Sequence, residues 1–123
     1  MPISSNPIYI HEPTDLQCGQ AVIAMLCGKE VDEVIKVTGT DRETDLKQML
    51  TALDFYDVKY NPQRKQAEKK GDLPPVALLS LETPRCWHWS LYFKGKFLDP
   101  EHGVLDDFPE ANRKFYWEII TIS

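Results

Sequence analysis

The spacing of the apolar residues changes once along the chain, just after Leu53. Before that point they recur at intervals of three and four, which places their side chains on one face of a helix. After it they form short runs rich in aromatic and β-branched residues, such as 75–81 and 115–122, which is typical of strands. Helices followed by strands indicate the α+β class, and we expect N-terminal helices packed on an antiparallel β-sheet. With 123 residues, the chain has the length of a single domain, residues 1–123.

The first half of the chain predicts helices. Residues 18–27 are almost continuously apolar and end at Gly28, which predicts a buried helix of about ten residues. A shorter helix is predicted from Val31 to Gly39. For the third helix, Thr40-x-x-Glu43 matches a capping box. The apolar residues that follow it at i, i+3, i+4 and i+7 are Leu46, Met49, Leu50 and Leu53.

The second half predicts strands. The runs with strand composition are residues 55–60, 75–81, 86–99 and 115–122. The run 86–99 is predicted to be a hairpin that turns at Lys94-Gly95, with aromatic residues on both arms. The basic segment 64–70 is interpreted as a solvated loop or helical turn, with a binding patch as the alternative.

Composition excludes several classes of function. The chain has 19 acidic and 14 basic residues, so it lacks the positive charge with which nucleic-acid-binding proteins neutralise phosphates. Its longest apolar run, Ala21–Cys27, is far shorter than the roughly 20 residues that cross a bilayer. The N-terminus lacks the features of a signal peptide, and three cysteines without disulfide spacing fit a reducing compartment. We therefore expect a cytoplasmic protein that binds neither nucleic acid nor membrane.

Cys18 is the candidate nucleophile. A nucleophilic cysteine needs a stabilised thiolate, a base within hydrogen-bond reach and a group that orients the base. Cys18 opens the first predicted helix, where unpaired N–H groups and the positive end of the helix dipole favour the thiolate. Gly19 follows, and we expect it to let a substrate backbone approach closely. Cys27 is interpreted as a buried hydrophobe, and Cys86 as a structural residue or a second thiol near the site.

The predicted hairpin supplies a base and its partner. Alternation along the first arm places His88 and Ser90 on one face of the strand. If Lys94-Gly95 forms a two-residue loop, Ser90 lies opposite Asp99. His88 is then diagonal to Asp99 on the same face, where the carboxylate can orient the imidazole and stabilise its protonated form. A three-residue loop would instead move Asp99 to the other face.

Two segments resemble a known enzyme family. Residues 15–26, Asp-Leu-Gln-Cys-Gly-Gln-Ala-Val-Ile-Ala-Met-Leu, are similar to the nucleophile helix of papain-like cysteine peptidases. Within that family, the resemblance is greatest to the bacteriocin-leader (double-glycine) peptidases. His88-Trp89, followed by Phe97-Leu98-Asp99-Pro100, resembles the histidine strand of that group and its closing Asp-Pro. The order and spacing of these motifs extend the resemblance over residues 8–122.

The resemblance implies a papain-like fold and a cysteine hydrolase that cleaves a peptide or amide bond. Cys18 would attack the carbonyl, His88 would exchange protons with the thiol and the leaving group, and Asp99 would orient His88. The backbone N–H of Cys18 would supply one oxyanion contact. The substrate would be a peptide or protein, and the reaction needs no cofactor.

Glu12 departs from the pattern of the family. The family usually carries a glutamine six residues before the cysteine as an oxyanion donor, and a carboxylate there would repel the developing negative charge. Gln17, adjacent to Cys18, need not point into the site. A second interpretation is therefore a catalytically weak papain-like domain that binds a peptide or partner protein. Acyl transfer to an amine is an alternative to hydrolysis, and the oligomeric state stays open.

A metal site is not expected. Zinc could gather Cys18, Cys86 and His88 with His11 or His102, but the sequence has no compact second pair of ligands. His11 and His102 are instead expected at the surface.

Overall fold

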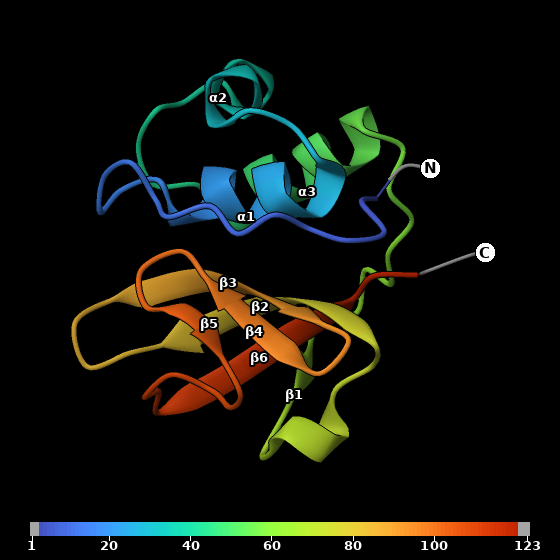
Figure 1. The fold of residues 1–123 in the computed structure, drawn as a ribbon, viewed down its shortest axis with the longest axis vertical. Helices are drawn as coiled ribbons and strands as arrows, with labels where there is room; N and C mark the ends of the chain where they lie inside the picture. The colour runs from blue at the N-terminus through green and yellow to red at the C-terminus, as the bar shows by residue number, and fades with distance from the viewer. Residues whose placement is uncertain (1–2, 121–123) are drawn as a thin grey trace.

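A layer of helices lies on one face of an antiparallel sheet (Figure 1). The structure, a computed structural model, describes residues 3–120. Its helices are α1 (Cys18–Cys27), α2 (Val31–Thr38), α3 (Leu46–Phe55) and a short 3₁₀ helix, Lys70–Asp72. Its strands are β1 (Lys65–Gln66), β2 (Val76–Glu82), β3 (Trp87–Phe93), β4 (Lys96–Asp99), β5 (Gly103–Leu105) and β6 (Arg113–Glu118). They form one sheet in the order β1-β6-β2-β3-β4-β5, with antiparallel neighbours. The expected α+β arrangement is confirmed.

The first two helices end where the sequence predicts. At Gly28 the backbone is left-handed (φ 67°), a conformation that glycine adopts without steric cost, and its N–H donates to the carbonyl of Ala24. Gly39 ends α2 in the same way and donates to Ile35. In α1 every residue from Cys18 to Leu26 is buried, because the helix lies between the sheet and α2. Within residues 3–120, no helix is long and apolar enough to cross a membrane.

The third helix begins later than predicted. The N–H of Gln48 donates to Asp45 Oδ1 at 2.8 Å, and the N–H of Asp45 donates to Gln48 Oε1 at 3.0 Å. The capping box is therefore formed by Asp45 and Gln48, and the prediction that Thr40 and Glu43 form it is wrong. Residues 40–45 instead form a loop that packs over the start of α1, where the side chain of Gln20 binds two of its carbonyls.

The strand predicted over residues 55–60 is also wrong. Phe55 is the last residue of α3, and Asp57 then reverses the chain with a left-handed backbone (φ 59°). Among residues 55–60, only Tyr60 takes part in β pairing, in a single isolated bridge to Ile119, just beyond β6. The helix takes only Phe55, whose side chain is exposed, and the left-handed backbone at Asp57 interrupts the rest of the predicted strand.

The hairpin has the predicted turn and register. Lys94 and Gly95 both have positive φ (45° and 94°), as a two-residue turn between twisted strands requires. Phe93 pairs with Lys96, and the register continues to Leu91 opposite Leu98. Counting back one more position sets Ser90 across from Asp99.

The remaining strands agree in part with the sequence. The buried strand predicted at 75–81 is β2. The last strand begins earlier than predicted, at Arg113, and residues 121 and 122 of that prediction lie outside the described residues. The basic segment 64–70 contains the two-residue strand β1 and leads into the 3₁₀ helix. β5 was not predicted.

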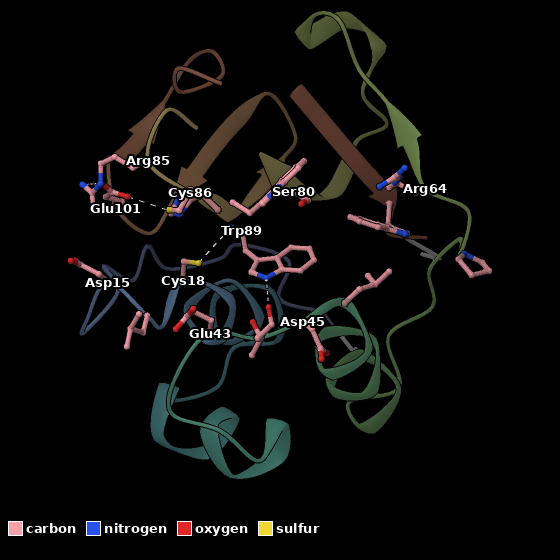
Figure 2. A pocket seen from close by; sticks show the side chains of 17 residues that line it. Asp15, Cys18, Glu43, Asp45, Arg64, Ser80, Arg85, Cys86, Trp89 and Glu101 are labelled. Carbon is pink, nitrogen blue, oxygen red and sulfur yellow. Dashed lines mark hydrogen bonds and ion pairs between the residues drawn. The ribbon is translucent and has the colours of Figure 1, made fainter. Parts of the chain in front are cut away.

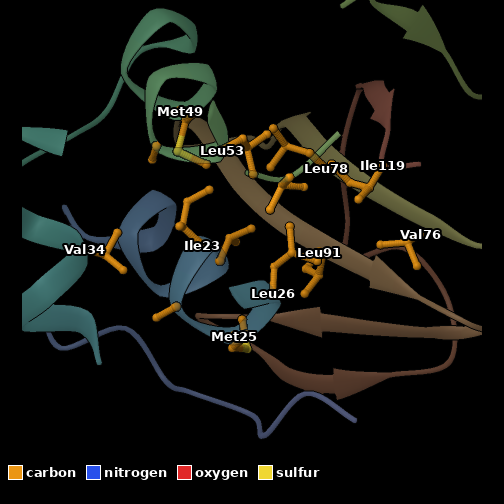
Figure 3. Packing of buried hydrophobic residues seen from close by; sticks show 14 of the residues in the cluster. Ile23, Met25, Leu26, Val34, Met49, Leu53, Val76, Leu78, Leu91 and Ile119 are labelled. Atoms are coloured by element: carbon orange, nitrogen blue, oxygen red, sulfur yellow. The ribbon is translucent and has the colours of Figure 1, made fainter. Parts of the chain in front are cut away.

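Alternation along the strands divides the apolar residues between the two faces of the sheet. On the face toward the helices, Ile23 of α1 and Leu53 of α3 pack against Leu78 and Leu91 (Figure 3). The opposite face carries a smaller cluster, which includes Leu79, Leu81, Tyr92, Phe97 and Tyr116. Packing on the first face fixes the N-terminal end of α1 against the beginning of β3.

Candidate active site

Cys18 is the first residue of α1 and lines a cavity of about 900 Å³ between the helices and the sheet (Figure 2). Its thiol accepts a hydrogen bond from the backbone N–H of Trp89, at an N–S distance of 3.5 Å. The first N–H groups of α1 have no partner within the helix and lie beside the same side chain. The Trp89 N–H and the start of the helix are the kind of surroundings that favour negative charge on sulfur.

His88 and Asp99 meet as the hairpin register predicts. His88 Nε2 lies 2.9 Å from Asp99 Oδ1, and the two residues are 4% and 0% exposed. The pair forms because the two-residue turn places both side chains on one face of the sheet. Since Asp99 engages Nε2, Nδ1 is the ring nitrogen left for Cys18. The sequence prediction that Cys18, His88 and Asp99 come together agrees with this geometry.

The charges of the histidine and the aspartate support each other. Burial by itself would lower the pKa of His88, but hydrogen bonds to the Asp99 carboxylate and the Cys18 thiol outweigh it and raise that pKa to about 10. Burial would likewise raise the pKa of Asp99, whereas the hydrogen bond and charge of His88 lower it to about 2. His88 is therefore protonated and Asp99 ionised at neutral pH.

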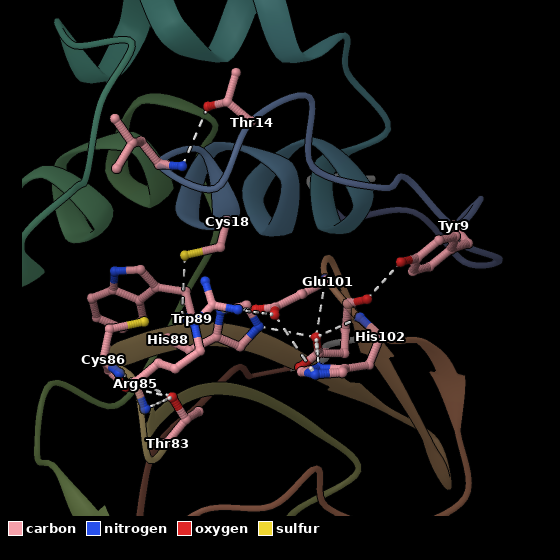
Figure 4. A network of polar contacts seen from close by, with 12 residues as sticks. Tyr9, Thr14, Cys18, Thr83, Arg85, Cys86, His88, Trp89, Glu101 and His102 are labelled. Carbon is pink, nitrogen blue, oxygen red and sulfur yellow. Dashed lines mark hydrogen bonds and ion pairs between the residues drawn. The ribbon is translucent and has the colours of Figure 1, made fainter.

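The Asp99 carboxylate is held by more groups than the sequence indicated. Its Oδ1 accepts the backbone N–H groups of Glu101 and His102 and faces His102 Nδ1, all at 3.0 Å (Figure 4). His102 is exposed, as expected, yet its contact with Asp99 was missed. The Asp99-Pro100 pair was the sequence signal for this turn. An aspartate that begins a turn accepts hydrogen bonds from N–H groups two and three residues later. Tyr9 adds a hydrogen bond from its hydroxyl to the Asp99 carbonyl at 2.6 Å.

Neither of the two side chains considered as oxyanion donors lines the cavity. The amide of Gln17 donates to the Asp41 carbonyl at 2.9 Å and so anchors the loop before α3. Glu12 is buried beside His88 and Glu101 and outside the cavity lining. Burial raises the pKa of Glu12 above its ordinary value despite the opposing charge of His88.

Gly19 has a different role from the one expected. A Cβ at this position would lie 2.0 Å from Thr44 Oγ1 and 2.9 Å from Met49 Sδ. Trp89 approaches on the third side, and its indole N–H donates to the Thr44 carbonyl at 2.9 Å. The glycine therefore lets the loop before α3 pack against the start of α1, and the prediction of space for a substrate backbone is wrong.

The cavity extends from Cys18 along an aromatic wall (Figure 2). Its sheet side includes Trp87, Trp89 and Trp117, and its helix side includes Glu43, Asp45 and Leu46. Arg64 lies at the end far from Cys18. Cys86 is exposed and also lines the cavity, whereas burial raises the pKa of Cys27 to about 12.

His88 belongs to two sets of potential metal ligands. Each set offers ligand atoms that all lie within 4.8 Å of one another, and the sets are Glu12–His88–Glu101 and His88–Asp99–His102. Over residues 3–120, no such set includes a cysteine, so the zinc site considered from the sequence does not form. Comparison of the sequence with protein-family models and with curated proteins found no match.

Proposed function

We propose that the chain is a papain-like cysteine hydrolase that cleaves a peptide or amide bond. One observation carries the proposal: Cys18 begins a buried helix, its thiol lines the same cavity as His88, and Nε2 of His88 is bound by buried Asp99. This is the nucleophile, base and orienting group that cysteine catalysis requires.

The geometry supports a two-step reaction. The Cys18 thiolate attacks the carbonyl carbon, and the oxygen takes up negative charge beside the N–H groups at the start of α1. Protonated His88 donates its proton to the nitrogen of the leaving amine as the C–N bond breaks, which leaves a thioester on Cys18. Neutral His88 then takes a proton from water, whose oxygen attacks the thioester. The acid and the thiolate are released, and an amine in place of water gives acyl transfer.

The cavity supports a peptide as substrate. Its length beyond Cys18 and its wall of three tryptophans suit an extended chain with apolar side chains, because aromatic surfaces provide large contact areas. Glu43 and Asp45 on one side and Arg64 on the other offer partners for charged groups of that chain.

The carboxylate of Glu12 favours a second function, the binding of a peptide or partner protein without efficient cleavage. It stands where a glutamine is expected, and it is buried against the base and not aimed into the cavity as a donor. Both functions predict that Cys18→Ala keeps its affinity for the ligand. They differ in turnover: the wild-type hydrolase cleaves the ligand and Cys18→Ala does not, whereas a binding domain leaves it intact in both.

The deciding experiment measures the rate of iodoacetamide alkylation at each cysteine as a function of pH, by mass spectrometry. We expect Cys18 to react at mildly acidic pH in the wild type, where ordinary thiols are slow, because His88 is positively charged beside it. His88→Ala should remove this reactivity, and His11→Ala should not. Cys27 serves as an unreactive internal control. A Cys18 that is inert, or that reacts identically in both variants, contradicts the hydrolase.

A further inference from the structure

Glu12, His88 and Glu101 come from three separate segments and converge at one point. Glu12 precedes α1, His88 lies on β3 and Glu101 lies in the turn between β4 and β5. One ligand atom from each lies within 4.8 Å of the other two. The convergence is fixed by the backbone, since the N–H of Glu12 donates to the carbonyl of Pro100 at 2.9 Å.

One oxygen of the Glu12 carboxylate lacks a hydrogen-bond partner within the described residues. The residue is 5% exposed, and across residues 3–120 its Oε1 is buried with no hydrogen-bond partner. A carboxylate removed from water without hydrogen bonds is strongly unfavourable, and buried charges are normally paired or bind metals. This unpartnered oxygen is a second observation besides the clustering. The charge of His88 lies near it, and a divalent ion that replaces the His88 proton would bond to the oxygen directly.

The orientation of His88 suits metal binding. Because His88 is protonated at neutral pH, a metal ion must displace the proton on Nδ1. Nε2 keeps its proton, which Asp99 accepts as a hydrogen bond, so the freed lone pair of Nδ1 is directed away from Asp99. A carboxylate behind a histidine is the usual arrangement at metal centres, where it fixes the ring and makes the other nitrogen a better ligand. Glu101 Oε2 lies 4.0 Å from this Nδ1.

We propose that Glu12, His88 Nδ1 and Glu101 bind a divalent transition-metal ion such as Zn²⁺. Ligand atoms that share zinc at 2.0–2.2 Å lie about 3.3 Å apart, so the cluster must contract by roughly 1 Å. Glu101 can provide this movement because its side chain is 33% exposed. Three protein ligands leave one tetrahedral position for water or a fourth group.

The other set of ligands around His88 is less suitable. In that set Asp99 Oδ1 already accepts two backbone N–H groups and faces both histidines. A metal ion there would have to displace the N–H groups that form the turn. His102 is therefore not a ligand in the proposed site.

A metal ion on Nδ1 would take the nitrogen that receives the proton of Cys18. Zinc would then be a reversible inhibitor, a consequence that rests on the proposed hydrolase function. The binding site itself does not rest on that function, so the two proposals can fail separately.

The first test is titration of the whole protein with Zn²⁺ by isothermal calorimetry. We expect one ion per chain, and Glu12→Gln and Glu101→Gln should each weaken binding by more than about tenfold. His11→Ala should bind as the wild type does. Glu101 lies in a turn and its side chain is partly exposed, so Glu101→Gln should fold. It therefore provides the test if Glu12→Gln does not fold. Absence of binding, or binding unaffected by both glutamine variants, overturns the proposal.

The second test separates the metal site from the thiol. Cys18→Ala should still bind Zn²⁺, and Co²⁺ bound to the wild type should show no thiolate-to-metal charge-transfer band. Loss of binding in Cys18→Ala would place the metal on sulfur and overturn the proposal. Saturating Zn²⁺ should also slow alkylation of Cys18 in the wild type but not in Glu12→Gln at the same concentration. If Cys18 is unreactive without metal, the hydrolase fails while the calorimetric result for the metal site stands.

Discussion

Strand β3 packs along α1, but different interactions stabilise its two halves. Beyond Ser90 the strand contributes apolar side chains such as Leu91, which meets other apolar residues of the helical face. Before Ser90 it contributes His88, which is just as buried yet depends on hydrogen bonds and charge. Apolar contacts are non-directional and tolerate small shifts, whereas the polar pair requires a particular register. The apolar half therefore contributes packing energy, and the polar half holds the pair on which the proposed chemistry depends.

The largest effect on stability is expected in the apolar half. Leu91→Ala removes a fully buried side chain between α1 and the sheet and should lower the free energy of unfolding by about 2–5 kcal/mol. Urea denaturation measures this loss. The folded fraction should still alkylate Cys18 at the wild-type rate. Loss of reactivity in protein that remains folded would show that the two halves are coupled.

A tight contact beside the polar half should have the next largest effect on stability. Gly19→Ala places a Cβ 2.0 Å from Thr44 Oγ1, and overpacking of this kind costs about 1–3 kcal/mol. Because Gly19 adjoins Cys18, alkylation should slow as well, unlike in Leu91→Ala. Measuring unfolding and alkylation on the same samples tests this, and unchanged reactivity would contradict the expected link between packing and the thiol.

Of the two halves of β3, only the polar half should make stability depend on pH. Asp99 has a folded pKa of about 2 against an ordinary value of 3.8. Because the folded value is the lower one, the ionised carboxylate stabilises the fold above about pH 4, and this contribution, about 2 kcal/mol, is lost as the pH falls toward 2. Asp99→Asn should flatten the urea-derived stability profile over this range, whereas Leu91→Ala should keep the wild-type slope.

The smallest effect is expected at the hairpin turn. Gly95 has a φ of 94°, and a Cβ added there would meet nothing within 4 Å, so Gly95→Ala incurs only backbone strain of roughly 1 kcal/mol. Register and Cys18 reactivity should persist, since the sheet contacts on both arms remain. NMR backbone amide shifts of β3 and β4 measure the register. A register slip in Gly95→Ala would contradict the prediction.

The parts that the sequence predicts correctly depend on local chemistry. The helix ending at Gly28 and the hairpin turn at Lys94-Gly95 are set by residues adjacent in the chain, and the hairpin register brings His88 to Asp99. The capping box was misplaced because Thr40 and Asp45 both match the pattern, and only packing against α1 selects the second.

The surroundings of the site could not be predicted, because long-range contacts create them. Glu12 is buried against Glu101 only after the N-terminal segment has docked on the turn that follows β4. His102 reaches Asp99 through a turn whose geometry is not evident from composition. Neither relation has a periodic pattern or a fixed spacing that a single sequence reveals.

The bond between the Tyr9 hydroxyl and the Asp99 carbonyl joins residues 90 positions apart. A ribosome adds about 5–20 residues per second, so Cys18 leaves it several seconds before Asp99 does. Throughout that interval the nascent chain carries the thiol without its base, its orienting carboxylate or the segment that supports them. Under the proposed function, the Cys18 thiol cannot become reactive before Asp99 has been synthesised and has folded against His88.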